Sequence, residues 1–304
     1  MKKIIALLLI LTLALSVFVS CGDDESTEKD YSLAIGVSLT AEGAKVSNTV
    51  AAIVTDSDGK IVLCRIDAID VEPTLKDGKL ESATYKSKAE LGDDYNMVAF
   101  GGAMAEWYIQ AKAVENFVVG KTQSEVAAIA VDGEDKPTDA DLAASCTIGI
   151  SEFKKAIDKA FASERKVSFK SASSLTAGVA VTANAALTEA ELSYTADFSA
   201  TVFADGKIVA AVIDSNEAAA TVKDNKIGTV SYEMTKLEKG DSYGMVNHGG
   251  AIAEWYAQAQ AFANTAVGKS ASELAALATE GVAGCTMYAG GYKAVLEKAA
   301  GYTR

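Results

Sequence analysis

The chain contains few of the residues on which most catalytic and metal sites depend. Its 304 residues include one histidine, four cysteines, two tryptophans and two prolines. The single histidine, His248, aligns with Phe100 in the internal repeat described below. A histidine base or metal ligand needed in every repeat is therefore excluded. We expect a hydrolytic enzyme least of all, because no nucleophile and base recur together.

The cysteines also provide no repeated reactive pair. Cys64 aligns with Ala211 in the repeat and is predicted to be a buried strand residue. Cys146 and Cys285 are equivalent, so neither has a repeated partner for a disulfide within its unit. A zinc site needs more ligands than this, and neither a phosphate-binding loop nor a dinucleotide fingerprint is present.

Only one long apolar run occurs, and it stands at the N-terminus. Ile4–Val19 follows Lys2 and Lys3 and is broken only by Thr12 and Ser16. A positive start, a short apolar core and small residues before a cut are typical of a secretory signal peptide, here residues 1–20. The run is shorter than the roughly 20 residues of a comfortable membrane-spanning helix. The sequence FVSCG, which ends this region, resembles the lipobox of bacterial lipoproteins, and the resemblance implies lipidation of Cys21.

The remaining chain is strongly acidic. Loss of Lys2 and Lys3 with the signal changes the net charge from −13 to −15. Such a chain binds nucleic acid poorly and is not held at anionic lipid by charge, so it depends on its acyl anchor. We expect it at the outer face of the cytoplasmic membrane. The polar residues 21–30 are predicted to be a lipidated, flexible tether.

A tandem repeat determines the predicted architecture. Residues 92–126 and 240–274 align without gaps at an offset of 148, and 21 of the 35 positions are identical by direct count. Repeats of this length indicate domains rather than solenoid units. We therefore predict one repeat domain over residues 31–162 and a second over 177–304, joined by a linker over 163–176.

Each copy is predicted to place strands first and helices afterwards. Strands are expected at 33–39, 48–56 and 60–67, and again at 178–184, 197–203 and 207–214, with Asp-Gly hairpin turns. A helix is expected over 103–119, ended by Gly120, and another opens at Thr122 in a capping box that Ser270 repeats. Last helices are expected over 151–160 and 292–300. The fold class is α+β: two tandem copies of an antiparallel sheet with helices packed on one face.

Two repeated aromatic pairs are candidate ligand contacts. Trp107-Tyr108 recurs as Trp255-Tyr256, and these are the only tryptophans. Adjacent helical residues point about 100° apart, so one ring faces the core and the other lines a pocket or stacks on a planar ligand. Packing of both rings in the core and at its boundary is the favoured alternative.

A small-residue loop before the last helix is the second candidate. It runs from Asp141 to Thr147 in copy one and from Glu280 to Thr286 in copy two. A hydroxyl placed just before a helix lies near free amides and a partial positive charge, which suit a phosphate. On the pattern alone, a plain N-terminal turn is the favoured explanation.

These loops and the turn at Asp58–Val62 resemble the extracytoplasmic FMN-binding domain family. Its members join a DGKI hairpin to helices and to a D-x-x-S/T-G-A-S/T motif, whose last threonine carries FMN through its phosphate. The resemblance implies that Thr147 and Thr286 bear the flavin and that Asp141 and Glu280 occupy the acidic position. It also implies a flavin transferase and a membrane redox donor as partners. Cys146 and Cys285 replace the alanine of the motif.

The leading hypothesis is thus a lipid-anchored extracytoplasmic FMN-binding protein that carries electrons at the cell surface without substrate turnover of its own. A solute-binding or adhesive lipoprotein, with the Trp-Tyr helix lining a cleft, is the alternative. The chain lacks the alternating βα pattern of periplasmic binding proteins. A structural spacer in the cell envelope is a third hypothesis.

Overall fold

A computed structural model describes residues 27–302 of the chain. The predicted signal peptide and Cys21 lie outside the described residues. Among residues 27–302, no helix is both long and apolar enough to cross a bilayer.

The first half of the structure, residues 29–162, begins with three long strands and ends with helices. Its strands are β1 (Lys29–Glu42), β2 (Lys45–Asp56), β3 (Ile61–Val71), β4 (Leu75–Lys76), β5 (Lys79–Leu80) and β6 (Thr84–Tyr85). Its helices are α1 (Lys88–Leu91), η1 (Gly92–Tyr95), α2 (Met97–Gly101), α3 (Trp107–Phe117), α4 (Gln123–Ala127), α5 (Ala140–Ala143) and α6 (Ser151–Ala162).

The second half, residues 175–301, follows the same order. Between the halves lies β7 (Val167–Ser171), and the second half's strands are β8 (Leu175–Leu187), β9 (Glu191–Ala204), β10 (Lys207–Lys223) and β11 (Lys226–Tyr232). Its helices are α7 (Lys236–Lys239), η2 (Gly240–Tyr243), α8 (Met245–Gly249), α9 (Trp255–Asn264), η3 (Ala271–Ala276) and α10 (Gly290–Gly301). The predicted α+β class, with antiparallel sheets and helices, is confirmed.

Two antiparallel sheets form the centre of the structure. The first has the strand order β3-β2-β1-β7 and the second the order β11-β10-β9-β8-β6; β4 and β5 form a separate small hairpin. Each sheet receives one strand from outside its own half. The short strand β6 pairs with β8, and β7 pairs with β1 through Lys29↔Ser171 to Leu33↔Val167.

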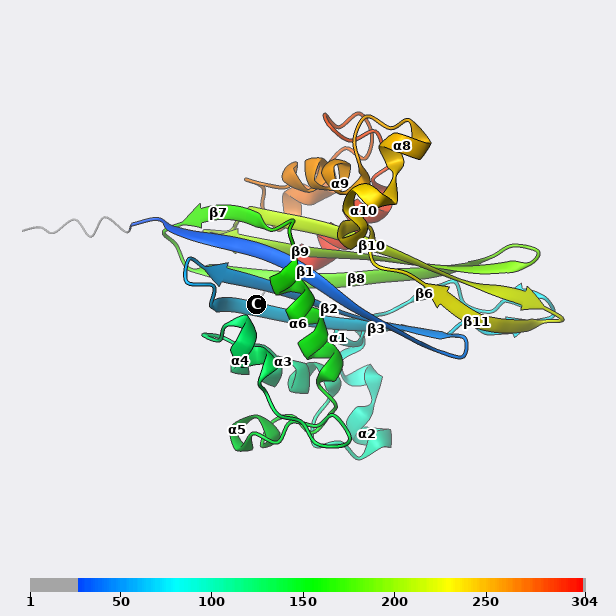
Figure 1. The fold of residues 1–304 in the computed structure, drawn as a ribbon, viewed down its shortest axis with the longest axis horizontal. Helices are drawn as coiled ribbons and strands as arrows, with labels where there is room; N and C mark the ends of the chain where they lie inside the picture. The colour runs from blue at the N-terminus through cyan, green and yellow to red at the C-terminus, as the bar shows by residue number, and fades with distance from the viewer. Residues whose placement is uncertain (1–26, 303–304) are drawn as a thin grey trace, which may run out of the picture.

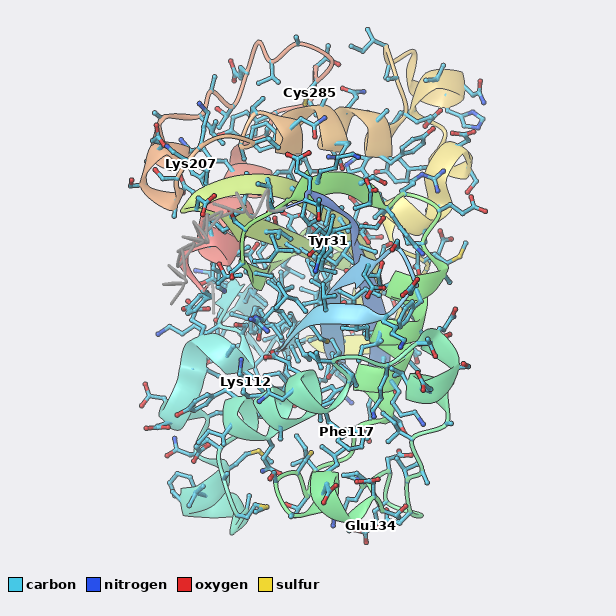
Figure 2. The ribbon with its side chains drawn as sticks, turned by 90° about the vertical axis from the view of Figure 1, so that its left-hand side faces the viewer. Tyr31, Lys112, Phe117, Glu134, Lys207 and Cys285 are labelled. Atoms are coloured by element: carbon cyan, nitrogen blue, oxygen red, sulfur yellow. The ribbon has the colours of Figure 1, made fainter. Side chains whose placement is uncertain are left out.

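The two sheets pack face to face, and helices cover the outer face of each (Figures 1 and 2). The order of layers is therefore helix, sheet, sheet, helix. Helix α6 lies on β1 and β2, and α3 lies on β3. Helix α10 lies on β8 and β9, and α9 lies on β10.

Burial of both faces explains the composition of the central strands. In β2, Val50, Ala52 and Val54 belong to the core between the sheets. Their neighbours Ala51 and Ile53 point the other way, into the core beneath the helices. Successive strand residues face opposite sides, so a strand buried on both sides needs a continuous apolar run rather than an alternating one.

Local signals in the sequence are confirmed where they rest on turn and cap chemistry. Asp205 and Gly206 both have positive φ, 50° and 73°, as a two-residue hairpin turn requires. Gly120 has the expected positive φ, 82°, but α3 ends at Phe117 with Val118 as its C-cap, so the glycine lies one residue beyond the predicted C′ position. Both predicted capping boxes form, at Thr122 with Glu125 and at Ser270 with Glu273.

Three predicted boundaries differ from the structure. The helix expected to begin at Ala103 begins at Trp107, because Gly102 has φ 61° and Glu106 is extended. Strand β1 begins at Lys29, inside the predicted tether. The segment predicted as a linker, 163–176, contains β7, which completes the first sheet.

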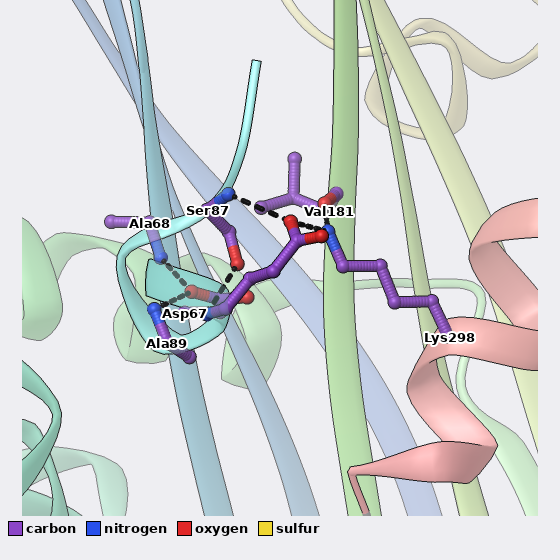
Figure 3. A network of polar contacts seen from close by, with 7 residues as sticks. Asp67, Ala68, Ser87, Ala89, Val181 and Lys298 are labelled. Atoms are coloured by element: carbon purple, nitrogen blue, oxygen red, sulfur yellow. Dashed lines mark hydrogen bonds and ion pairs between the residues drawn. The ribbon is translucent and has the colours of Figure 1, made fainter. Parts of the chain in front are cut away.

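A buried aspartate lies at each of the two seams between the halves. At one seam Asp67 accepts hydrogen bonds from the backbone N–H groups of Ala68 and Ala89, at 2.7 and 3.1 Å (Figure 3). Above it, Lys298 of the second half donates to Glu90 at 2.7 Å and to the Val181 carbonyl at 2.8 Å. Helix α10 is thereby linked to α1 of the other half.

The other seam repeats this arrangement with the halves exchanged. Asp214 accepts from the N–H groups of Ser215 and Leu237, at 2.7 and 2.9 Å. Lys159, at the end of α6, forms an ion pair with Glu238 at 2.9 Å. The last helix of each half is therefore joined to the first helix of the other.

The two buried aspartates predict a pH dependence of stability. Burial raises the pKa of Asp67 to about 6 and that of Asp214 to about 7, whereas an unfolded aspartate titrates near ~3.9. The folded state then binds more protons across this window, so the free energy of unfolding falls as the pH rises through it. Relative to the parent, we expect Asp67→Asn and Asp214→Asn each to gain roughly 2 to 4 kcal/mol of unfolding free energy between pH 4 and pH 8, with the larger gain for Asp214.

Urea denaturation at the two pH values measures this difference. The exposed Asp94→Asn variant is the matched control and is expected to follow the parent. If the parent, the two buried-aspartate variants and Asp94→Asn all lose the same unfolding free energy between the two pH values, the buried carboxyls do not cause the pH dependence of stability.

Candidate functional site

The two threonines predicted to carry flavin occupy equivalent and exposed positions. Thr147 lies in the loop between α5 and α6, and Thr286 in the loop before α10. The backbone N–H of Thr147 donates to Gln110 Oε1 at 2.8 Å, and its hydroxyl donates to the same oxygen at 3.2 Å. Thr286 makes the same two bonds to Gln258, at 2.8 and 3.0 Å.

The glutamine in each half is fully buried, at 0% exposure. Gln110 Nε2 donates to the Ala105 carbonyl at 2.7 Å, and Gln258 Nε2 donates to the Ala253 carbonyl at 2.8 Å. One buried amide thus joins the threonine loop to the segment before α3 or α9. We call this arrangement the threonine clamp. Because a buried amide without partners is costly, the clamp fixes the threonine in one position.

The threonines lie outside the first turn of the helices that follow. Helix α6 begins at Ser151 with Ile150 as its N-cap residue, and α10 begins at Gly290 with Ala289. Thr147 and Thr286 each precede the N-cap by three residues. The expectation of a hydroxyl next to the free amides of a helix start is therefore not met, because an intervening loop carries each threonine away from the helix.

A shallow groove of about 440 Å³ lies beside the loop of the first half. It runs along α3, and its polar and aromatic lining includes Lys112, Asn116, Phe117, Asp141 and Ser145. Lys112 and Phe117 stand on the same helix (Figure 2). Asp141 is exposed in the first turn of α5, so the acidic residue and the small-residue loop do lie at one groove.

The loop of the second half is packed differently. A Cβ at Gly284 would lie 3.1 Å from the Ala261 Cβ on α9, so this loop lies close against the helix. Glu280 is exposed. Tyr288, two residues after Thr286, is 71% exposed and is the nearest open aromatic ring in the sequence of this loop.

The two tryptophans are core residues. Trp107 is 4% exposed and packs edge-on against Phe153 of α6, with ring centroids 5.7 Å apart. Trp255 is 1% exposed, packs at 5.7 Å against Tyr292, and donates its indole N–H to the tyrosine oxygen at 3.0 Å. Neither ring presents a face for stacking on a ligand.

The neighbouring tyrosines are held at the surface by carboxylates. The hydroxyl of Tyr108 donates to Asp93 at 3.1 Å, and that of Tyr256 donates to Asp241 at 3.0 Å. Neither tyrosine lines the groove along α3. The structure therefore brings Asp141 and the Thr147 loop to one groove but does not bring the Trp-Tyr pair there.

The cysteines outside the signal region are buried and free. Cys64 is 0% exposed on β3, as its alignment with Ala211 predicts. Cys146 and Cys285 lie beside the clamped threonines, and burial raises the pKa of the Cys146 thiol. Within residues 27–302 no group of three or more His, Cys, Asp and Glu side chains is arranged to hold a metal ion.

Each half has an exposed apolar surface, here called its apolar tip, that was not predicted from the sequence. In the first half it comprises Val98, Phe100 and Met104, which are 46%, 87% and 54% exposed. In the second it comprises Val246 and Ile252, at 42% and 65%. The two tips lie at opposite ends of the molecule, at α2 and α8 (Figure 1).

The tips are anchored by a repeated glutamate. Glu106 accepts from the N–H groups of Met97 and Val98 at 2.9 and 3.0 Å, and Glu254 accepts from Met245 and Val246 at 2.8 and 3.1 Å. The carboxylate at the start of α3 or α9 thus caps the short helix that carries the tip. The repeated sequences GGAMAE and GGAIAE could have indicated the tips. Met104 recurs there as Ile252, and both side chains are exposed instead of facing the core.

A comparison of the chain with protein-family models finds no match, and comparisons with curated proteins and with solved structures find none either.

Proposed function

We propose that the chain is a lipid-anchored extracytoplasmic carrier that holds FMN at Thr147 and Thr286. The observation that supports this proposal is the threonine clamp. A fully buried glutamine in each half orients one exposed threonine, and the arrangement occurs twice with the same three hydrogen bonds. An exposed hydroxyl in a fixed position is accessible to a modifying enzyme.

The residues around Thr147 suit a flavin better than those around Thr286. In the first half, Ser145 of the Thr147 loop lines the groove along α3, where Lys112, which also pairs with Glu115 at 3.7 Å, would attract a phosphate and the Phe117 ring forms an apolar wall. In the second half, Gly284 brings the loop against α9, which leaves the exposed Tyr288 as the neighbouring ring. A bound flavin would supply electron transfer, while the protein supplies attachment and position. The buried Trp107 and Trp255 have no part in holding it.

Covalent attachment is tested by mass. The mature protein co-expressed with a flavin transferase is expected to be yellow and heavier by FMN minus water at each modified site. Thr147→Ala and Thr286→Ala are each expected to remove one increment, because each removes the accepting oxygen. Thr138→Ala, which changes another exposed threonine, is the matched control. A colourless protein of unmodified mass would refute the proposal.

The anchor is tested separately from the flavin. Lipidation of Cys21 is expected to place the protein in the membrane fraction of its host, and Cys21→Ser is expected to release it or leave it as an unprocessed precursor. Fractionation together with labelled palmitate measures both. If Cys21→Ser still incorporates palmitate and remains with the membrane after cleavage, the anchor is not at this residue.

The apolar tips favour a second candidate function, adhesion to a partner protein. Residues 92–106 and 240–254 contain acidic residues but no lysine or arginine. The chain as a whole is also strongly acidic, which opposes self-association and contact with anionic lipid. Charge complementarity therefore favours a basic partner with apolar side chains, and one tip per half provides two such contacts.

Binding of an amphipathic Lys-Leu peptide tests the tips. We expect two peptides per chain by calorimetry, and one after the double substitution Phe100→Ser with Met104→Ser, because one apolar surface is lost. Met234→Ser, which changes an apolar residue of 59% exposure outside the tips, is the control. An equal loss in the control, or equal binding of a Lys-Gln peptide, would show only non-specific attraction to an acidic protein.

A further inference from the structure

The two seams between the halves differ in one respect: one is filled and the other contains a cavity. At the first seam the Lys298 side chain is 15% exposed and reaches both Glu90 and the Val181 carbonyl (Figure 3). At the second seam Lys159 is 41% exposed and pairs with Glu238. A cavity of about 320 Å³ lies there, between the end of α6, β1, β10 and α7. We call it the seam cavity.

Arg165 forms one wall of the seam cavity and has no anionic partner among the described residues. Its guanidinium lies 4.2 Å from the centroid of the Tyr256 ring. Its Nε is buried and makes no hydrogen bond within residues 27–302. A guanidinium carries several N–H donors, and leaving a buried one unsatisfied is costly. An anion at this position would satisfy it.

The position of Arg165 depends on a glycine. A Cβ at Gly240 would collide with the Arg165 guanidinium. The equivalent Gly92 of the first half has open space around it, so a guanidinium packs against this glycine in the second half and not in the first. Arg165 stands three residues after the end of α6, whereas Tyr302 is the only residue described after α10. The contact with Gly240 therefore distinguishes the seam that holds the arginine.

The rest of the seam cavity is lined by small and apolar residues of β1, α6 and α7 and by four further ionisable side chains. Glu164 and Glu238 provide its acidic groups, Glu238 while paired with Lys159. Burial raises the pKa of the fourth group, Asp214, to about 7. Planar guanidinium groups bind carboxylates through two parallel hydrogen bonds. Glu164 and Glu238 would repel a dianion such as phosphate, whereas they would attract a cationic group on the same ligand as the carboxylate. The volume lies at the small end of the range for ligand sites, about 300–1,000 Å³.

We propose that the seam cavity binds a free α-amino acid, with its carboxylate on Arg165 and its ammonium group toward Glu238. The ligand would contact both halves of the molecule at once. This site is separate from the threonine clamps and does not depend on the presence of flavin.

Native mass spectrometry and calorimetry of the mature protein with each of the twenty standard amino acids test the proposal. We expect one amino acid per chain for at least one of them. Propionate and propylamine, which carry only one of the two charges, are expected to bind more than tenfold more weakly than that amino acid. If none of the twenty binds, or if propionate binds as tightly, the proposal is wrong.

Variants separate binding from stability. Arg165→Lys retains the charge but loses the planar fork, and it is expected to lower affinity at least tenfold; Glu238→Gln is expected to weaken binding as well. Lys166→Ala, at the neighbouring residue, and Glu90→Gln, at the filled seam, are matched controls expected to bind as the parent does. Circular dichroism identifies variants that fail to fold. A purely structural arginine would lower the melting temperature without any ligand-dependent difference, and that result would overturn the proposal.

Discussion

The packing of one β-sheet on another is the constraint on which the rest of the structure depends. Because each sheet is covered by its partner on one side and by helices on the other, its strands are buried on both faces. The two repeats therefore share one core between the sheets. The buried hydrogen bond from Asn216 Nδ2 to Asn48 Oδ1, at 2.7 Å, lies within this contact. Because a buried polar group needs a hydrogen-bond partner, this contact helps to fix the position of one sheet on the other.

Strands that cross between the halves also hold the two sheets together. Strand β7, from the segment that joins the halves, completes the first sheet, and β6 of the first half adds to the edge of the second. The lysines of α6 and α10 link each last helix to the opposite half. The repeats thus form one compact unit with two related but unequal ends.

Sequence reasoning succeeded where a feature depends on a few adjacent residues. The Asp205-Gly206 turn and the capping boxes at Thr122 and Ser270 follow from local chemistry. The face-to-face packing of the sheets was not predictable in this way, since a continuously apolar strand such as β2 does not reveal what covers each side. The role of β7 also depends on a partner strand over a hundred residues away.

The candidate site was only partly predictable for the same reason. The exposed threonines and the acidic residue Asp141 were located by the repeat. The clamp itself was missed, although Gln110 and Gln258 recur at identical repeat positions where a helix face is buried. The tryptophans follow the favoured alternative of the sequence analysis: both are core residues, packed against Phe153 of α6 and Tyr292 of α10, and neither lines the groove along α3.

The position of β1 within the first sheet would have a mechanical consequence if the proposed lipid anchor holds the protein by its N-terminus. Strand β1 is hydrogen-bonded along both edges, to β2 from Tyr31 to Glu42 and to β7 from Lys29 to Leu33. A pulling force that enters at Lys29 acts along the strand and loads these bonds together in shear, instead of opening them one at a time. The first described strand is thus placed to transmit tension from an anchor into the whole sheet.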